Sequence, residues 1–87
     1  MVSEKVLPSI NPLLRRPVVE QAMGKSRSTI YREIKAGLMT KPVKIGGDCS
    51  AWPGNEVNAI NQARISGNSD EEIKKLVIEL EAARMGA

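Results

Sequence analysis

The segment from residue 24 to residue 37, GKSRSTIYREIKAG, encodes a short helix whose start and end are both visible in the sequence. Ser26 is a favourable N-cap, because its hydroxyl can accept a hydrogen bond from an otherwise unpaired amide of the first turn. Gly37 follows the last periodic residue and can adopt the left-handed conformation that ends a helix. Ile30 and Ile34 are four positions apart and mark the buried face. We therefore predict a short amphipathic helix between Ser26 and Gly37.

The other face of this predicted helix is polar and cationic. At about 100° per residue, five positions fall together on it: Arg27, Ser28, Tyr31, Arg32 and Lys35. Arginine can form paired hydrogen bonds to guanine or to phosphate, and hydroxyl groups can reach phosphates or base edges. Lys35 is one turn further along and is expected to contact the phosphate backbone. This face suits DNA, and the alternative is an ordinary surface helix with scattered cations.

A second short helix is predicted immediately before this one. Pro17 is well suited to the first position of a helix, and Gly24 would end that helix. Two short helices that are joined by a tight, glycine-containing turn are typical of a helix-turn-helix.

A hairpin is predicted immediately after the cationic helix. Residues 41–45 alternate, and Pro42 restricts them to the start or the edge of a sheet. Residues 46–48, Gly-Gly-Asp, favour a turn, and residues 49–52 would form the returning strand. An isolated hairpin is only marginally stable in water, so we expect Ile45 and Trp52 to pack this wing against the helices.

The C-terminal third is predicted to contain two more helices. Pro53 begins the first, which ends near Gly67, and Ser69 with Glu72 forms a capping box that starts the second near Asp70. The second helix has one apolar stripe, which consists of Ile73, Leu76, Val77, Leu80 and Ala83. Ile78 and Met85 lie outside that stripe. The helix therefore either packs on the core of its own chain or assembles protomers.

These elements predict a mainly α fold with a small β-hairpin, that is, a winged helix-turn-helix plus an extra C-terminal helix. The expected division is a flexible arm over residues 1–12, a DNA-binding domain over residues 13–66, and a C-terminal helix for packing or oligomerisation over residues 67–87. Charge follows the same division. Residues 15–44 contain eight cations and two acids, whereas residues 66–87 contain three cations and five acids. We expect the first region to face a polyanion and the second to face away from it.

The composition argues against catalysis and against metal binding. The chain has no histidine and one cysteine, Cys49, so it can form neither a histidine-based nucleophilic relay nor a zinc site of ordinary ligands. The acids at positions 70–72 are better explained by helix capping than by a cation site. We therefore expect no catalytic residue, no metal and no cofactor. Neither a run of about 20 apolar residues nor a secretion signal is present, which predicts a cytoplasmic protein without membrane contact.

Several of these pieces, in this order, resemble the AlpA family of prophage regulatory proteins. They are SRSTIYREIKAG at 26–37, KPVKIGG at 41–47, Trp52, and the pair Glu56 and Val57. The similarity spans residues 13 to about 60. The family is related to phage excisionases and to MerR-type winged helices, so the resemblance implies a winged helix-turn-helix that binds double-stranded DNA and regulates transcription. The alternatives are an excisionase that assists an integrase and, more remotely, a protein-interaction module that acts through the C-terminal helix and can self-associate.

The resemblance also implies where DNA would bind. The recognition helix in the major groove would present Ser26, Arg27, Ser28, Tyr31 and Arg32. Family members often have arginine at one or both of the positions that Asp48 and Cys49 occupy here. An acidic wing tip would repel phosphate, and Lys41 and Lys44 on the strand that leads into the wing would partly substitute. The expected DNA-binding set is Ser26, Arg27, Ser28, Tyr31, Arg32, Lys35, Lys41 and Lys44.

Overall fold

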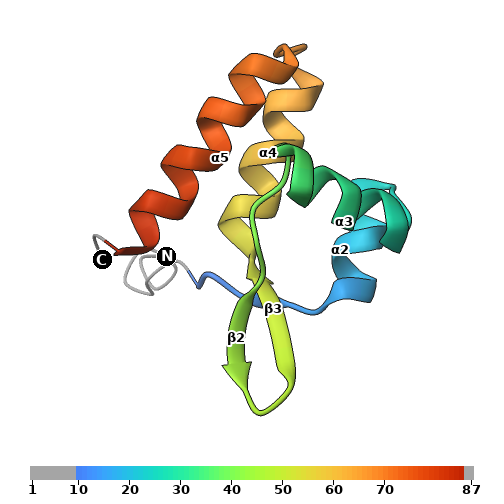
Figure 1. Cartoon of the computed structure of the whole chain (residues 1–87), viewed down its shortest axis with the longest axis vertical. Coiled ribbons are helices and arrows are strands. Elements are labelled where there is room, and N and C mark those ends of the chain that lie inside the picture. The colour runs from blue at the N-terminus through green and yellow to red at the C-terminus, as the bar shows by residue number, and fades with distance from the viewer. Residues whose placement is uncertain (1–9, 86–87) are drawn as a thin grey trace, which may run out of the picture.

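The computed structural model describes residues 10–85, which form a body of helices with a small antiparallel sheet at one end (Figure 1). In chain order the elements are β1 (Leu13–Leu14), α2 (Arg16–Met23), α3 (Arg27–Ala36), β2 (Val43–Gly46), β3 (Cys49–Pro53), α4 (Gly54–Ile65) and α5 (Asp70–Met85). Helices α4 and α5 lie side by side and antiparallel, α2 and α3 lie to one side of them, and the β2–β3 hairpin projects from the body. This is the predicted winged helix-turn-helix with an added C-terminal helix.

The two caps predicted for the cationic helix are confirmed. The Ser26 hydroxyl accepts a hydrogen bond from the Thr29 amide at 3.2 Å, and α3 starts at the next residue. Gly37 has a φ of 81°, in the left-handed region, and its amide donates to carbonyls of the last turn. Gly24 ends α2 in the same way with a φ of 66°. Only two residues therefore separate α2 from the cap of α3, which fixes the tight turn of the motif.

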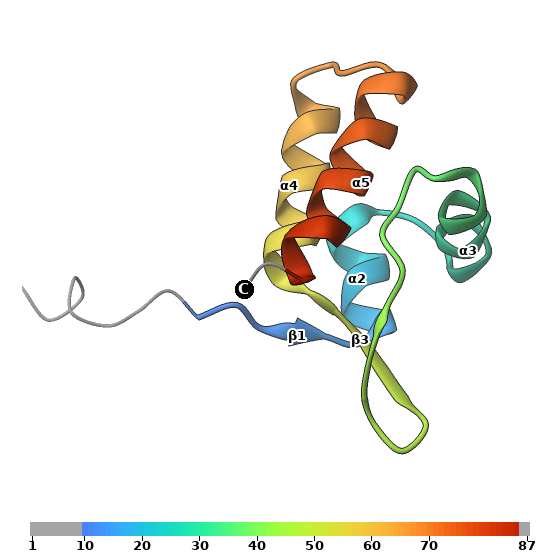
Figure 2. The same ribbon diagram turned by 60° about the vertical axis from the view of Figure 1, so that its left-hand side comes forward.

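The sheet contains one strand that the sequence patterns did not predict. Its order is β1-β3-β2, and β1 pairs antiparallel with the end of β3, Leu13 opposite Pro53 and Leu14 opposite Trp52. A strand of two residues is too short to show a period of two, so no pattern in the sequence could indicate it. Figure 2 shows β1 beside β3 at the base of the body.

The residues just before β1 are fastened to the start of α4. The Gly54 amide donates to the Pro12 carbonyl at 2.7 Å, and a β-carbon at Gly54 would lie 2.9 Å from the Pro12 ring. Glycine is therefore needed at position 54 for this close approach. Asn11 accepts from the Asn55 amide at 2.8 Å and so satisfies an amide in the first turn of α4. Residues 1–9 of the predicted arm lie outside the described residues.

Trp52 is the centre of the core. It is 1% exposed, and its indole N–H donates to the Thr40 carbonyl at 2.8 Å. The buried cluster around it consists of Val19, Ile30, Met39, Val57, Ile60, Ala63, Ile73 and Val77. The expectation that Ile45 packs against the helices is wrong, because it is 42% exposed. It lies on the edge strand β2, next to an irregularity in the pairing, where the hairpin projects beyond the helices.

Helix α5 begins at the predicted capping box and packs on this core. Ser69 and Glu72 exchange hydrogen bonds between side chains and amides at 2.8 Å and 3.2 Å. Ile73 and Val77 are buried, and Leu76 and Leu80 pack against the cluster, whereas Ala83 is exposed. Ile78 is 69% exposed, and the Met85 side chain lies outside the described residues. Within residues 10–85, no helix has both the length and the apolar character that a bilayer span requires.

Thr40 offers a direct test of the packing beneath the wing. It is fully buried, and its hydroxyl has no hydrogen-bond partner in the structure. Replacing Thr40 with Val removes an unpaired polar atom at nearly constant volume, so we expect unfolding stability to rise by up to about 1 kcal/mol. Urea denaturation would measure the change. The control is Thr29→Val, which removes a hydroxyl that has partners and should lower stability. A loss of stability for Thr40→Val would contradict the assigned environment.

Candidate nucleic-acid interface

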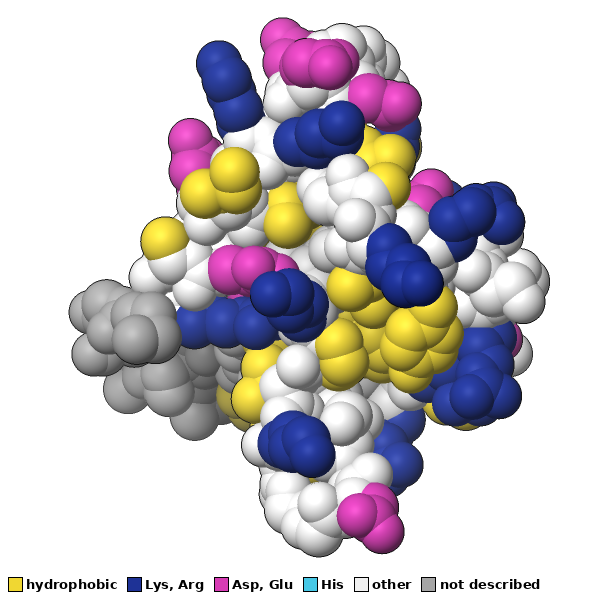
Figure 3. All heavy atoms as spheres, in the orientation of Figure 1, with side chains coloured by type: hydrophobic (Ala, Val, Ile, Leu, Met, Phe, Trp, Pro, Cys, Tyr) yellow, Lys and Arg dark blue, Asp and Glu magenta, His cyan; other side chains and the backbone are white. Residues whose placement is uncertain are grey.

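Helix α3 presents the predicted polar face to solvent. Its buried side is anchored by Ile30, which is fully buried, and by the half-buried Ile34. The side chains of the opposite face are all exposed: Arg27, Ser28, Tyr31, Arg32 and Lys35. Figure 3 shows dark-blue side chains around an apolar patch in the region of α3, and acidic side chains gathered near the turn between α4 and α5. The structure thus brings this part of the predicted set together on one surface.

A chain of hydroxyl contacts organises the first turn of α3. Ser26 caps the helix and also donates to the Thr29 hydroxyl at 3.1 Å. The Arg32 guanidinium donates to the same hydroxyl at 3.4 Å. The Ser26 side chain is therefore already engaged within the protein, while Arg32 is steered along the exposed face of the helix.

Tyr31 connects this face to the core. Its ring meets the Trp52 ring edge-on, with centroids 6.5 Å apart and an angle of 62° between the planes. The Arg27 guanidinium lies 5.9 Å from the centre of the Tyr31 ring, within the range of a cation–π contact. Because Trp52 is fixed in the core, Tyr31 has a defined position at the surface although it is 41% exposed. Ordering side chains before binding lowers the entropic cost of contact with a ligand.

The wing carries both signs of charge. Lys44 lies on β2 and Asp48 lies in the turn, and both are exposed. Lys41 lies just before β2 with an exposed side chain and a backbone that contacts α5. The two lysines that were expected to assist DNA binding therefore lie on the segment that links α3 to the wing tip.

Two arginines that were outside the predicted set lie beside Tyr31 of α3. Arg15 and Arg16, at the start of α2, line a polar hollow of about 300 Å³ together with Tyr31, Asp48 and Ser50. Arg16 is paired with Glu20 at 2.8 Å, whereas Arg15 is exposed. The charge count of residues 15–44 included both residues, but their place beside α3 depends on tertiary structure.

An ion pair that the sequence patterns missed links α5 to the base of the wing. Arg84 donates to both carboxylate oxygens of Glu56 at 2.7 Å and 2.6 Å, and to the Lys41 carbonyl at 2.6 Å. Glu56 is 1% exposed. The hydrogen bond to Glu56 and then the attraction of Glu56 and Glu81 raise the pKa of the Arg84 guanidinium above its ordinary value, against the opposing effect of burial. The charge pattern of α5 gave no sign that its arginine, Arg84, would turn inward.

The side chains of the described region offer no arrangement typical of a metal centre. Within residues 10–85, no group of three or more Cys, His, Asp or Glu side chains is placed to hold an ion. Cys49 is exposed at the start of β3 and forms no disulfide. The exposed face of α3 offers guanidinium, ammonium, hydroxyl and aromatic groups.

Comparison with known proteins matches the part of the chain that holds this surface. The family model described as prophage CP4-57 regulatory protein (AlpA) matches residues 12–65, which run from just before β1 to the end of α4. A protein of Enterobacteria phage P4, described as uncharacterized protein ORF88, is 44% identical over 54 residues. The match covers 62% of this chain and 61% of that protein, so less than two thirds of the relative is spanned. No solved structure matches the chain significantly.

Proposed function

Since this chain belongs to the AlpA family of prophage regulatory proteins, we propose that it is a sequence-specific DNA-binding regulator of transcription. In this proposal α3 enters the major groove, as the second helix of a helix-turn-helix does. The observation that carries the proposal is the exposed face of α3, which is capped at both ends and presents two arginines beside a tyrosine held by Trp52.

Within this proposal some side chains contact base edges and others contact only the phosphate backbone. Arg27 and Arg32 contact guanine edges or phosphates in pairs of hydrogen bonds, while Ser28 and Tyr31 contact a phosphate or a base. The positions that contact the phosphate backbone are Lys35, Lys41, Lys44 and the newly identified Arg15. Ser26 contributes mainly as the cap that starts the helix. Asp48 keeps the wing tip away from phosphate by charge repulsion.

Salt dependence tests the proposal without knowledge of the operator. If about four cations neutralise phosphates, affinity for a random-sequence duplex should fall about 100-fold as salt rises from about 50 to 200 mM. Fluorescence anisotropy would show a linear plot of log affinity against log salt. The Lys35→Ala/Lys44→Ala double variant should make the slope of this plot shallower by about 2, because two phosphate contacts are lost. The proposal would be refuted if the wild-type chain failed to bind at the lowest salt.

Mapping bound genomic fragments separates the regulator from the excisionase. Both functions would use the same face of α3. Fragments at a promoter would support transcriptional regulation, whereas fragments at the ends of an integrated element would support assistance to an integrase.

A further inference from the structure

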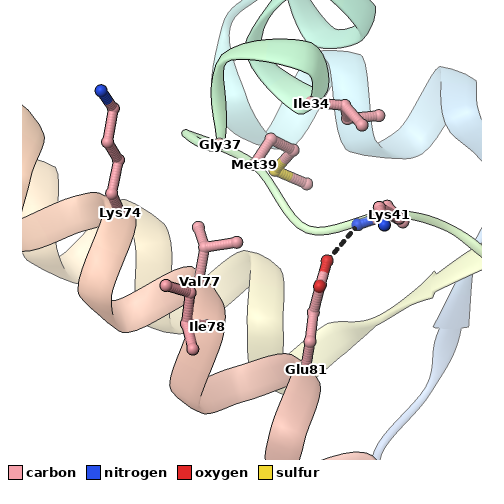
Figure 4. A pocket seen from close by; sticks show the side chains of 8 residues that line it. All are labelled: Ile34, Gly37, Met39, Lys41, Lys74, Val77, Ile78 and Glu81. Carbon is pink, nitrogen blue, oxygen red and sulfur yellow. Dashed lines mark hydrogen bonds between the residues drawn. The ribbon is translucent and has the colours of Figure 1, made fainter.

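The segment that leads into the wing, at Thr40 and Lys41, is hydrogen-bonded by side chains of α5 and β3. The Lys41 amide donates to Glu81 at 2.8 Å, and the Lys41 carbonyl accepts from Arg84 at 2.6 Å. Just before it, the Thr40 carbonyl accepts from the Trp52 indole. Figure 4 shows the Glu81 side chain reaching from α5 to the backbone at Lys41. Both backbone polar groups of Lys41 are thus bound by the last turns of α5.

The Arg84 side chain is fixed by Glu56, so its hydrogen bond to the Lys41 carbonyl has a defined geometry. Its guanidinium makes two charge-assisted hydrogen bonds to Glu56, which is 1% exposed in the first turn of α4. Charge-assisted, bidentate hydrogen bonds between an arginine and a carboxylate are strong and directional. One side chain of α5 therefore connects the base of β2 with the helix that follows β3.

The wing needs such support at its base. β2 is an edge strand, and the pairing between it and β3 is irregular between Lys44 and Gly46. A hairpin with few other contacts is marginally stable, and its direction is decided where it leaves the body. The same segment, residues 37–42, connects the end of α3 to β2, so fixing Lys41 fixes the wing relative to α3.

We propose that Glu81 and Arg84 are positioning residues for DNA binding, which hold Lys41 and thereby place Lys44 in register with α3. This inference rests on the proposed function. It gives α5 a role in the interface although α5 lies outside residues 12–65, which the family model matches.

Glu81 is the better residue to change, because removing Arg84 would leave the buried Glu56 carboxylate without a partner. Glu81→Ala deletes the acceptor of the Lys41 amide, and Glu81→Gln keeps an oxygen that can accept it. Asp70→Ala is the matched control, since it removes a carboxylate of α5 that pairs with Arg64 instead of the wing.

The first readout needs no DNA. Amide hydrogen exchange of Lys41 and of residues 43–46 should become about tenfold faster in Glu81→Ala, because one hydrogen bond at the base is lost. Exchange in α3 should stay the same, and Glu81→Gln should restore slow exchange in the wing. Unchanged exchange in Glu81→Ala, or equal acceleration in Asp70→Ala, would overturn the inference that Glu81 holds Lys41 in place.

The second readout is a double-mutant cycle on a short random-sequence duplex at low salt. Lys44→Ala should weaken binding by about fivefold in the wild-type chain and by less than about twofold in the Glu81→Ala background. Arg27→Ala should lower the affinity equally in both backgrounds, since the position of α3 does not depend on the contact between Glu81 and Lys41. Equal effects of Lys44→Ala in both backgrounds would overturn the positioning role while leaving the proposed function intact. Failure of the wild-type chain to bind would overturn the proposed function and the positioning role together. The exchange data would still show whether Glu81 and Arg84 hold Lys41 in place.

Discussion

Replacing both Arg27 and Arg32 with Ala should weaken binding to the cognate DNA by about 2–6 kcal/mol, at least about 30-fold in Kd. Each arginine that reads a base contributes about 1–3 kcal/mol, and the two side chains have different intramolecular contacts, Tyr31 for Arg27 and Thr29 for Arg32. The cognate duplex would come from the bound genomic fragments, and anisotropy titration would give Kd. The fold should be unaffected, because both side chains are exposed.

The comparison with a random duplex decides what these arginines do. If they read bases, the loss on random DNA should be much smaller than on the cognate site, and sequence preference should collapse. Equal losses on both duplexes would show that they contact phosphate alone. Lys75→Ala is the control for the loss of a surface cation away from α3, since it removes an exposed cation from α5 and should leave both affinities unchanged. A double variant with undiminished cognate affinity would contradict the recognition role of α3.

The local elements of this fold were predictable because their signals are local. The N-cap at Ser26, the glycine stops at Gly24 and Gly37, and the Ser69 capping box each act within a few residues. The exposed face of α3 followed from helical periodicity for the same reason. In contrast, β1 depends on pairing with β3 some 40 residues away, and two residues carry no periodic pattern.

The contacts that join elements were not predictable from periodicity or charge. A carboxylate at the start of α4 and an arginine at the end of α5 look like ordinary helix-end charges that complement the dipole. Only the antiparallel packing of α4 and α5 brings Glu56 and Arg84 together. The same holds for Tyr31, whose contact with Trp52 depends on where the wing strand β3 passes α3.

Arg84→Met should destabilise the fold by about 3–5 kcal/mol, because it leaves the Glu56 carboxylate buried without a partner. A domain of this size has a total stability of about 4–13 kcal/mol, so a large share of it would be lost. Urea denaturation at neutral pH would measure the change. Asp70→Ala, which breaks a pair whose acid is largely exposed, should cost no more than about 1 kcal/mol. A similarly small cost for Arg84→Met would contradict the buried pair.

The double variant Glu56→Leu/Arg84→Met separates stability from wing placement. An apolar pair of similar volume removes the uncompensated charge, so stability should return to within about 1 kcal/mol of the wild-type chain. The hydrogen bond to the Lys41 carbonyl is not restored, because methionine has no donor. We therefore expect a stable domain in which the amides of residues 43–46 still exchange faster than in the wild-type chain. Recovery of slow exchange together with stability would show that packing alone places the wing and that the guanidinium is dispensable there.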